Sequence, residues 1–489
     1  MSHSPHPTHS THSSHASDDH ALGLQPRRSW AVLILALAAQ VLVVLDISVV
    51  NTAMPAIGRD LRLASSDLQW MVTAYLLLSG GGLLLGGRIA DLLPRRRVFM
   101  TGLTLFTTAS LFSGFASSAG ELIAGRALQG AGAALMTPAA LAIIMTTYTG
   151  AQRSRGLALW GAIGGLGIAA GVAVGGALTT WAGWQAIFWV NVPVGVVAFV
   201  SAARLLPREP AARVGVASFD ILGAGTVVTG LVALMYTLAR TESQGWASPD
   251  TITGLAVAAA ALAGFLVVER RAAAPLVHPH TWSIKSLVWS TAVMLGITGL
   301  LMGTIFLTTN FVQTTLGYSA LTAGLAFLPL AAALVVGTHL GSHVAGHASG
   351  RVIATIGLAV VAGGSLLLSR ATPAASYAVD LLPGLLVVGL GSGMVFVAVS
   401  AAAMSNIPDQ HAGMASGFMM TGHEIGAALG VAVLSAVATA AGSLTTSHGA
   451  AAAFEHGFVT AAGVAAVFAV IALLRMPATR GAAGHMHMH

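Results

Sequence analysis

Long apolar stretches alternate with short polar or charged connectors from Trp30 almost to the end of the chain. A helix needs about 20 apolar residues to cross the hydrocarbon layer of a membrane, and these stretches reach that length. They lack the alternating pattern of barrel strands, and irregular backbone cannot face lipid, so an all-α polytopic membrane protein is predicted. The fourteen expected spans cover residues 30–52, 69–89, 97–117, 121–145, 155–178, 186–206, 218–240, 251–269, 287–312, 321–342, 351–369, 379–402, 411–439 and 455–475.

Composition agrees with this class and sets the orientation. Of 489 residues, 55% are hydrophobic and 8% charged, which excludes an ordinary soluble globular protein. With the N-terminus inside, 17 of the 22 basic residues fall on the cytoplasmic side, so both termini are expected there. The Arg-rich, Lys-poor composition favours a bacterial inner (cytoplasmic) membrane. No cysteine is present and no basic aromatic face is visible, so neither a disulfide nor a nucleic-acid partner is expected.

The connectors suggest a division into domains. Two long charged connectors, residues 204–218 and 269–285, bracket the seventh and eighth spans. We therefore expect an N-terminal six-helix bundle, an inserted two-helix pair and a C-terminal six-helix bundle, with a substrate site between the bundles. The His-rich ends are expected to be cytoplasmic tails without a metal site, the first of them disordered; weak affinity for a divalent metal is the alternative. The expected segments are residues 1–25 (tail), 30–206, 218–269, 287–475 and 476–489 (tail).

Asp46 stands inside the first expected span, in the stretch LDISVVNTAMP at residues 45–55. An acid at the centre of a membrane helix costs about 2.5 kcal/mol or more, so such residues face a protein interior or a watery cavity and often relay protons. The alternative is a hydrogen-bonded acid that only holds neighbouring helices together.

Several motifs resemble those of one family. Residues 87–97, GRIADLLPRRR, are similar to the G-x-L-A-D-x-x-G-R-R signature of the major facilitator superfamily, with Leu92 and Pro94 departing from it. Residues 126–132, RALQGAG, resemble its R-x-x-Q-G-x-G motif. The glycine-dense fifth span resembles its antiporter motif, with Val172 in the place of proline. Residues 184–195, WQAIFWVNVPVG, and 45–55 look like the fourteen-spanning drug:proton antiporter branch, a group of multidrug efflux transporters.

The resemblance implies the major facilitator fold, with two six-helix bundles plus two additional transmembrane helices. Asp91 lies next to a helix end and an arginine cluster, where it can form a charge lock that breaks when the bundles rock. The residues expected at this conformational gate are Gly87, Asp91, Arg95 and Arg96. Those expected to pack the antiporter motif are Gly167, Gly171, Gly175 and Gly176. After residue 280 the resemblance weakens, and residues 341–351 lack the acid of a second loop signature.

Three charged residues are candidates for proton coupling. Asp46 and Arg126 lie at a similar depth, about 9 Å from the outer ends of spans that run in opposite directions. If these helices are neighbours, as the resemblance implies, Arg126 can hold Asp46 ionised or yield it to a proton; a permanent buried ion pair is the alternative. Glu424 lies about 20 Å inside the thirteenth span and is read as a cation-contacting or second protonatable group. Packing by a hydrogen bond is its alternative.

Polar and methionine side chains near these charges are candidates for substrate binding. Met420 and Glu424 share one helical face by their spacing, and a polar, aromatic mix ends the ninth span. The expected substrate-binding residues are Asn51, Gln129, Asn310, Gln313, Met420, His423 and Glu424.

The sequence therefore predicts a secondary active exporter of amphiphilic organic compounds in exchange for protons, by alternating access. No phosphate-binding G-x-x-x-x-G-K-[ST] pattern occurs, so no cofactor is expected and the energy would come from the proton gradient. The expected partners are a small organic substrate, protons and the lipid bilayer, and the chain is expected to act as a monomer and not as an enzyme. A proton-coupled symporter or facilitator for a nutrient, and a non-transport membrane sensor, are the alternatives.

Overall fold

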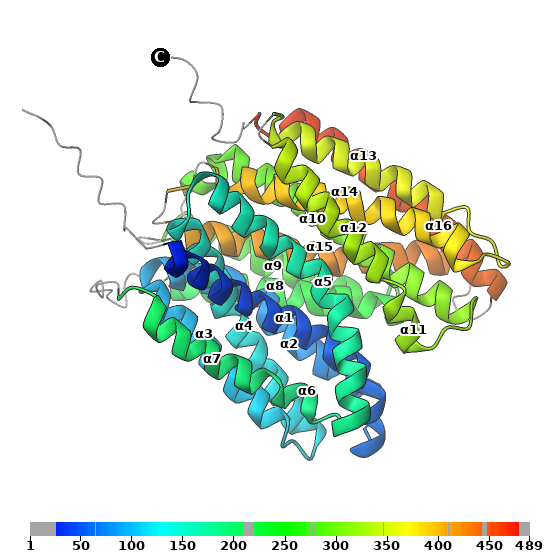
Figure 1. The fold of residues 1–489 in the computed structure, drawn as a ribbon, viewed down its shortest axis with the longest axis horizontal. Coiled ribbons are helices and arrows are strands. Elements are labelled where there is room, and N and C mark those ends of the chain that lie inside the picture. Colours follow the sequence, from blue (N-terminus) through cyan, green and yellow to red (C-terminus); the bar gives the residue numbers. More distant parts are fainter. Residues whose placement is uncertain are drawn as a thin grey trace, which may run out of the picture.

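The structure, a computed structural model, describes residues 26–63, 65–208, 220–272, 275–277, 279–345, 347–405, 407–408, 411–442 and 447–478. All regular elements in these ranges are helical (Figure 1). The histidines at both ends of the chain lie outside the described residues. An all-helical architecture is what the apolar stretches predict, because only helices satisfy their own backbone hydrogen bonds in lipid.

Seven helices precede the inserted pair. Polar side chains start some of them: Ser118 accepts a hydrogen bond from the Glu121 N–H at 3.4 Å, and the Glu121 carboxylate accepts the Ser117 N–H at 2.6 Å. This reciprocal cap satisfies backbone donors that the first turn leaves free. The helices are α1 (Pro26–Asp60), α2 (Ser65–Leu92), α3 (Arg95–Ser113), α4 (Ala119–Thr147), α5 (Gly150–Ala182), α6 (Ala186–Trp189) and α7 (Asn191–Leu205).

The remaining helices begin with the pair that the sequence predicts as an insertion, and that division into domains stays a prediction. The pair consists of α8 (Ile221–Gln244) and α9 (Pro249–Glu269), which starts with a proline where the missing N–H costs nothing. They are followed by η2 (Pro279–Ser283), α10 (Lys285–Thr314), α11 (Ala320–Leu325), α12 (Leu328–Val344), α13 (Gly350–Leu368), η3 (Tyr377–Leu381), α14 (Leu382–Met404), α15 (Ala412–Ala441) and α16 (Ser447–Arg475).

Three of the expected spans are each made of two pieces. The sixth is divided between α6 and α7 and the tenth between α11 and α12, whereas in the twelfth the π-helix η3 continues directly into α14. In each case a proline, at position 193, 329 or 383, lies in the first turn of the second piece. Proline has no N–H to donate to a preceding turn, so it is tolerated at the start of a helix and interrupts a longer one.

Counting each broken span once, the described residues form fourteen helical rods. Eleven of them are long and apolar enough to cross a membrane. Helix α8 contributes only a shorter apolar stretch, Leu222–Leu238. Helix α3 begins with three consecutive arginines, which lower its mean hydropathy. The class of fold is as predicted, and the number of fourteen membrane crossings stays a prediction.

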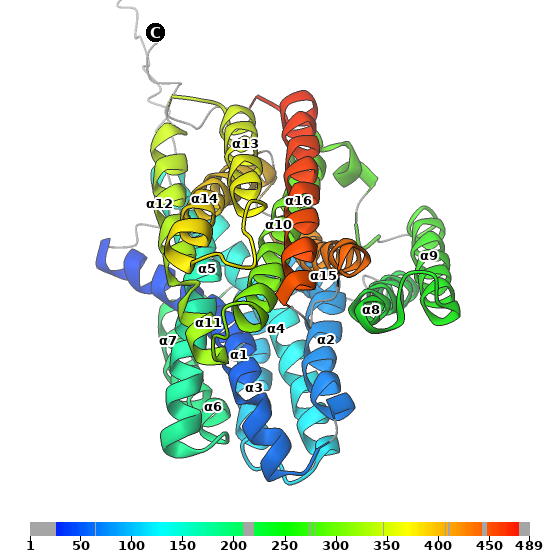
Figure 2. The same cartoon turned by 90° about the vertical axis from the view of Figure 1, so that its right-hand side faces the viewer.

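The helices gather into groups around a shared core. Figure 2 shows α1–α4, α6 and α7 in its lower part, α12–α14 and α16 in its upper part, and α8 with α9 to one side. The closest packing between the helices before α8 and those after α9 joins α2 to α15 and α5 to α12. The inserted helices pack on each other and, through α8, on α2 and α15. Because α8 and α9 lie to one side, they do not separate α2 from α15, and the direct contact between these two helices is a main junction of the fold.

Candidate functional site

A cluster of buried polar side chains surrounds Asp46 on α1. Asp46 is 2% exposed and both of its carboxylate oxygens accept hydrogen bonds. Arg126 on α4 donates to Oδ2 and forms an ion pair with it. Gln129, one turn further along α4, donates to Oδ1 at 3.0 Å, and Asn191 at the start of α7 donates to the same oxygen at 3.1 Å. Three donors from two other helices therefore hold this carboxylate.

The donors around Asp46 are themselves held in place. Arg126 Nη1 also donates to Gln129 Oε1 at 3.0 Å, and Gln129 Nε2 donates to the Ser110 hydroxyl on α3 at 2.7 Å. Asn191 reaches the same hydroxyl at 3.4 Å. An ion pair out of water is stabilised when its other polar atoms are also hydrogen-bonded, as both Asp46 oxygens are in this network; Arg126 Nε has no partner among the described residues. The network joins α1, α3, α4 and α7.

Tyr75 on α2 covers the guanidinium of Arg126. The Arg126 Cζ atom lies 4.3 Å from the ring centroid, and Tyr75 is 1% exposed. Its hydroxyl is buried without a hydrogen-bond partner among the described residues. Asp46, Arg126 and Glu424 are all close enough to act electrostatically on this hydroxyl. The charges of both the Asp46 cluster and the acid of α15 therefore act on Tyr75.

The α15 candidates lie along the junction with α2. The Glu424 side chain is 26% exposed, and its Oε1 lies 3.6 Å from His423 Nδ1. The His423 ring packs at 6.3 Å from that of Phe396, and Met420 is buried. A Cβ at Gly80 of α2 would lie 3.4 Å from Glu424 Cβ, so this acid sits against α2. Its part in binding a cation or a proton stays a prediction.

The other substrate-binding candidates are not joined to the Asp46 cluster by a described hydrogen bond. Asn310 donates to the Phe306 carbonyl of its own helix at 2.9 Å, and Gln313 is exposed. The side chain of Asn51 lies outside what the structure describes. Their part in substrate binding also stays a prediction.

Asp91 joins α2 to the start of α15. Its carboxylate accepts the N–H of Gly413 at 2.7 Å and of Met414 at 2.6 Å. Helix N-termini carry unpaired N–H groups and a partial positive charge, so a carboxylate is stabilised there. At Gly87 a Cβ would come within 2.4 Å of the Gly413 carbonyl oxygen, so the absence of a side chain permits this close crossing. The contact ties α2 to the start of α15 at the end where α2 finishes.

The arginines of the same loop have different surroundings. Arg96 donates to the Ala203 carbonyl near the end of α7 at 2.7 Å, which binds α3 to α7 within the N-terminal group. The positive charges of Arg95 and Arg88 act on Asp91. Asp91 therefore bonds to backbone N–H groups of α15, with the charges of Arg95 and Arg88 acting on it, and its part in a conformational gate stays a prediction.

Glycines of the antiporter-like stretch bring α5 against α1. A Cβ at Gly171 would lie 2.4 Å from Ser48 Cβ. Gly167 and Gly175 likewise face Val44 and Thr52, one turn before and after. Gly176 accepts the Thr180 hydroxyl through its carbonyl at 2.7 Å. The close contact includes Val44 and Ser48, which lie two positions before and after Asp46. Helix α5 therefore supports the part of α1 that carries the acid.

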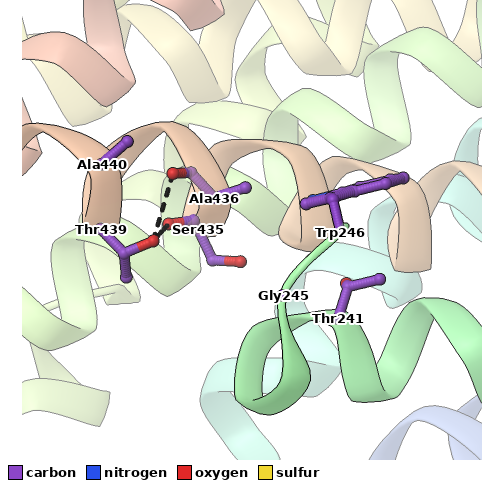
Figure 3. A pocket seen from close by; sticks show the side chains of 7 residues that line it. All are labelled: Thr241, Gly245, Trp246, Ser435, Ala436, Thr439 and Ala440. Carbon is purple, nitrogen blue, oxygen red and sulfur yellow. Dashed lines mark hydrogen bonds between the residues drawn. The ribbon is translucent and has the colours of Figure 1, made fainter. Parts of the chain in front are cut away.

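A pocket of about 290 Å³ lies between the α8–α9 turn and α15 (Figure 3). Its hydroxyls are used within their own helices, since Thr439 donates to the Ser435 and Ala436 carbonyls at 2.9 and 3.1 Å and Thr241 donates to Leu238 at 2.7 Å. The lining residues are Thr241, Gly245, Trp246, Ser435, Ala436, Thr439 and Ala440. They include no charged group, and the pocket is separate from the Asp46 cluster.

Sequence reasoning missed three members of the cluster. Asn191 lies within the WQAIFWVNVPVG stretch, and its signal was an amide with apolar residues on both sides. Ser110 and Tyr75 carry no comparable signal, because a hydroxyl in a membrane helix commonly bonds its own backbone.

Comparison with known proteins places the chain in a family. The model of the Major Facilitator Superfamily matches residues 36–431. The chain is 38% identical to the puromycin resistance protein pur8 of Streptomyces alboniger, over 92% of this chain and 90% of the relative. It is 37% identical to the cephamycin export protein CmcT of Amycolatopsis lactamdurans, over 90% and 91%. The fold is similar to that of the proton:xylose symporter XylE, with a TM-score of 0.65 at 14% identity over 93% of this chain and 97% of that one. These matches and the helical fold show that the chain is a multi-pass membrane transporter of the major facilitator superfamily.

Proposed function

We propose that this transporter exports amphiphilic organic compounds, antibiotics among them, from the bacterial cytoplasm in exchange for protons. The export direction and the substrate class are supported by the printed functions of its relatives, which concern puromycin resistance and cephamycin export. Proton exchange is supported by one structural observation, the buried Asp46 carboxylate held by Arg126, Gln129 and Asn191.

The chemistry of that cluster suits reversible protonation. An opposite charge and neutral donors stabilise the ionised acid, whereas a proton would replace the attraction to Arg126 and free its guanidinium. A group whose two charge states are both accessible can bind a proton when it faces one side and lose it when it faces the other. In this proposal Arg126 pairs with Asp46 while the acid is ionised and is released when the acid is protonated. Tyr75 stays stacked on the guanidinium in both states.

The energy source would be the proton gradient, with no bound cofactor. Asp91 holding the start of α15 would keep the cytoplasmic side shut in one state, and breaking that contact would open it. The α1–α5 glycine contact would carry the movement of one bundle to the helix bearing Asp46. The bilayer and the organic substrate complete the set of partners, and one chain would suffice for the cycle.

Countermovement distinguishes this proposal from symport. Inside-out vesicles containing the transporter are acidified internally, the gradient is monitored with a pH-sensitive dye, and puromycin is added outside. Antiport predicts that puromycin speeds proton exit from the vesicles, in wild type but not in Asp46→Asn. Symport predicts that puromycin drives protons inward, and no effect on the gradient would exclude proton coupling with this compound.

A further inference from the structure

Two acids lie at one end of the inserted helix pair, away from the Asp46 cluster. Asp220 precedes α8 and its Oδ1 caps that helix by accepting the Gly223 N–H at 2.8 Å. Glu269 ends α9, is 5% exposed, and accepts the Val277 N–H through Oε1 at 2.5 Å. Since α8 and α9 form an antiparallel hairpin, the start of one helix and the end of the other meet.

The second oxygen of each carboxyl group has no donor. Asp220 Oδ2 and Glu269 Oε2 are both buried and lack a hydrogen-bond partner among the described residues. Because α8 and α9 pack as a hairpin, these two unpaired oxygens lie at the same end of it, and the Asp220 charge acts on Glu269. Two unprotonated carboxylates there would repel in a poorly solvated place, whereas a single proton lets one carboxyl group donate to the other. We propose that Asp220 and Glu269 form a proton-binding site in which the two carboxyl groups share one proton.

The charges around the pair match one proton. Arg88 on α2 is the cation from a neighbouring helix that acts on Glu269, and its Nε is buried without a partner among the described residues. Arg270 and Arg271, next to Glu269 in the chain, are exposed to solvent. With one proton the pair carries a single negative charge facing Arg88. Without it, two negative charges would face this one partly buried cation, which also acts on Asp91.

The site is connected to the junction of α2 and α15 through Val277. Val277 and Leu276 belong to one buried apolar cluster with Leu84 of α2 and Met414 of α15. Glu269 holds the N–H of Val277, and Asp91 holds that of Met414. If the shared proton leaves, repulsion between the carboxyl groups would displace the segment after α9 and loosen the packing beside the Asp91 contact. This step rests on the proposed opening at that contact; the proton site itself does not.

Infrared spectroscopy of the purified transporter tests the proton site directly, through the carbonyl band of a protonated carboxyl group. Asp220→Asn and Glu269→Gln are each expected to remove the same single band near neutral pH, and the double variant no further band, because one proton is shared. Asp250→Asn, an exposed acid at the opposite end of α9, is the matched control and should remove none. Arg88→Gln keeps both carboxyl groups and should hold the band to higher pH, which provides a second test if a carboxyl variant fails to fold. Unchanged bands in the folded variants, or a separate band lost in each, would overturn the proposal.

Thiol labelling then tests the link to the junction. The chain has no cysteine, so a single one can replace Ser416, which is fully buried in α15. Labelling from the cytoplasmic side, relative to a cysteine at exposed Gln152, should rise with pH in the wild-type background and become independent of pH in Glu269→Gln. Equal pH dependence of labelling in the wild-type and Glu269→Gln backgrounds would show that the proton site does not affect the junction. Failure of proton exchange in vesicles would instead contradict the proposed function and leave the infrared result standing.

Discussion

Asn191 and Asp46 are 145 positions apart in the chain, and the Asn191 amide donates a 3.1 Å hydrogen bond to Asp46 Oδ1. The bond exists because α7 starts at Asn191, directly after the break that separates it from α6. A helix that continued unbroken through this point would direct the amide differently. The break in the sixth span therefore helps to build the cluster around the acid.

Replacing Asn191 by leucine, which has a similar shape, should slow proton-coupled export by about tenfold or more. The reason is that a hydrogen bond to a charged group contributes about 1.5–3 kcal/mol, and its loss leaves Asp46 with fewer donors. The measurement is puromycin-driven proton exit from vesicles, with a thermal melt to establish that the variant is folded. Wild-type exchange by a folded Asn191→Leu protein would show that the amide has no part in coupling.

At position 75 the ring should matter more than the hydroxyl. The hydroxyl has no described partner, whereas the ring face lies against Arg126, a contact that contributes about 0.5–2 kcal/mol. Tyr75→Phe is expected to retain exchange, and Tyr75→Ala to lose most of it, because alanine also leaves a cavity beside the guanidinium. If phenylalanine is as harmful as alanine in the vesicle assay, the hydroxyl rather than the ring supports coupling.

A methyl group added at Gly171 should force α5 away from α1. Its Cβ would lie 2.4 Å from Ser48 Cβ, and overpacking of this kind costs about 1–3 kcal/mol. Gly171→Ala is therefore expected to lower both the melting temperature and the export rate. Gly363 on α13 has open space at the same position, so Gly363→Ala is the matched control and should melt at or above the wild-type temperature. Equal melting of the two variants would contradict the close α1–α5 contact.

Weakening the Asp91 contact should open the cytoplasmic side. Asparagine has one acceptor oxygen where aspartate has two, so Asp91→Asn keeps at most one of the bonds to Gly413 and Met414. Labelling of a cysteine at Ser416 is expected to rise by about tenfold, the equivalent of losing one charge-assisted hydrogen bond. Asp380 also holds a backbone N–H, that of Ser376 at 2.7 Å, but at the start of η3, so Asp380→Asn is the control. An equal rise in Ser416 cysteine labelling in Asp91→Asn and Asp380→Asn would show that Asp91 has no special part in closing the cytoplasmic side.

Much of the fold could be predicted from the sequence, because lipid leaves few alternatives to an apolar helix. Hydropathy does not locate the starts of α7, α12 and α14, because an apolar stretch has the same length whether or not its helix is continuous; the prolines at 193, 329 and 383 are the local signal. The proximity of Arg126 to Asp46 followed from counting residues from the helix ends, once the family resemblance made the two helices neighbours. The estimated depths of Asp46 and Arg126 alone would not have shown that α4, and not another helix, is the neighbour of α1.

The rest of the site depends on contacts between helices that the sequence around each residue does not reveal. Asn191 and Ser110 meet only where α3, α4 and α7 converge, so neither is identified by its immediate neighbours. Asp91 was expected to lock against a charged partner, and its bonds to the start of α15 arise from the close crossing at Gly87. Asp220 and Glu269 stood at the edges of two connectors, where acids are normally solvated, and only the folded hairpin brings them together and buries Glu269.

Proton release on substrate binding is the most direct test of the role of Asp46. Purified transporter in weakly buffered detergent solution is mixed with puromycin, and the released protons are counted with a pH indicator. Wild type should release protons in proportion to bound puromycin, and Asp46→Asn should bind puromycin without releasing any, because an amide keeps the shape of the acid but cannot exchange a proton. The same proton release from wild type and Asp46→Asn at equal occupancy would contradict the assignment of proton exchange to Asp46.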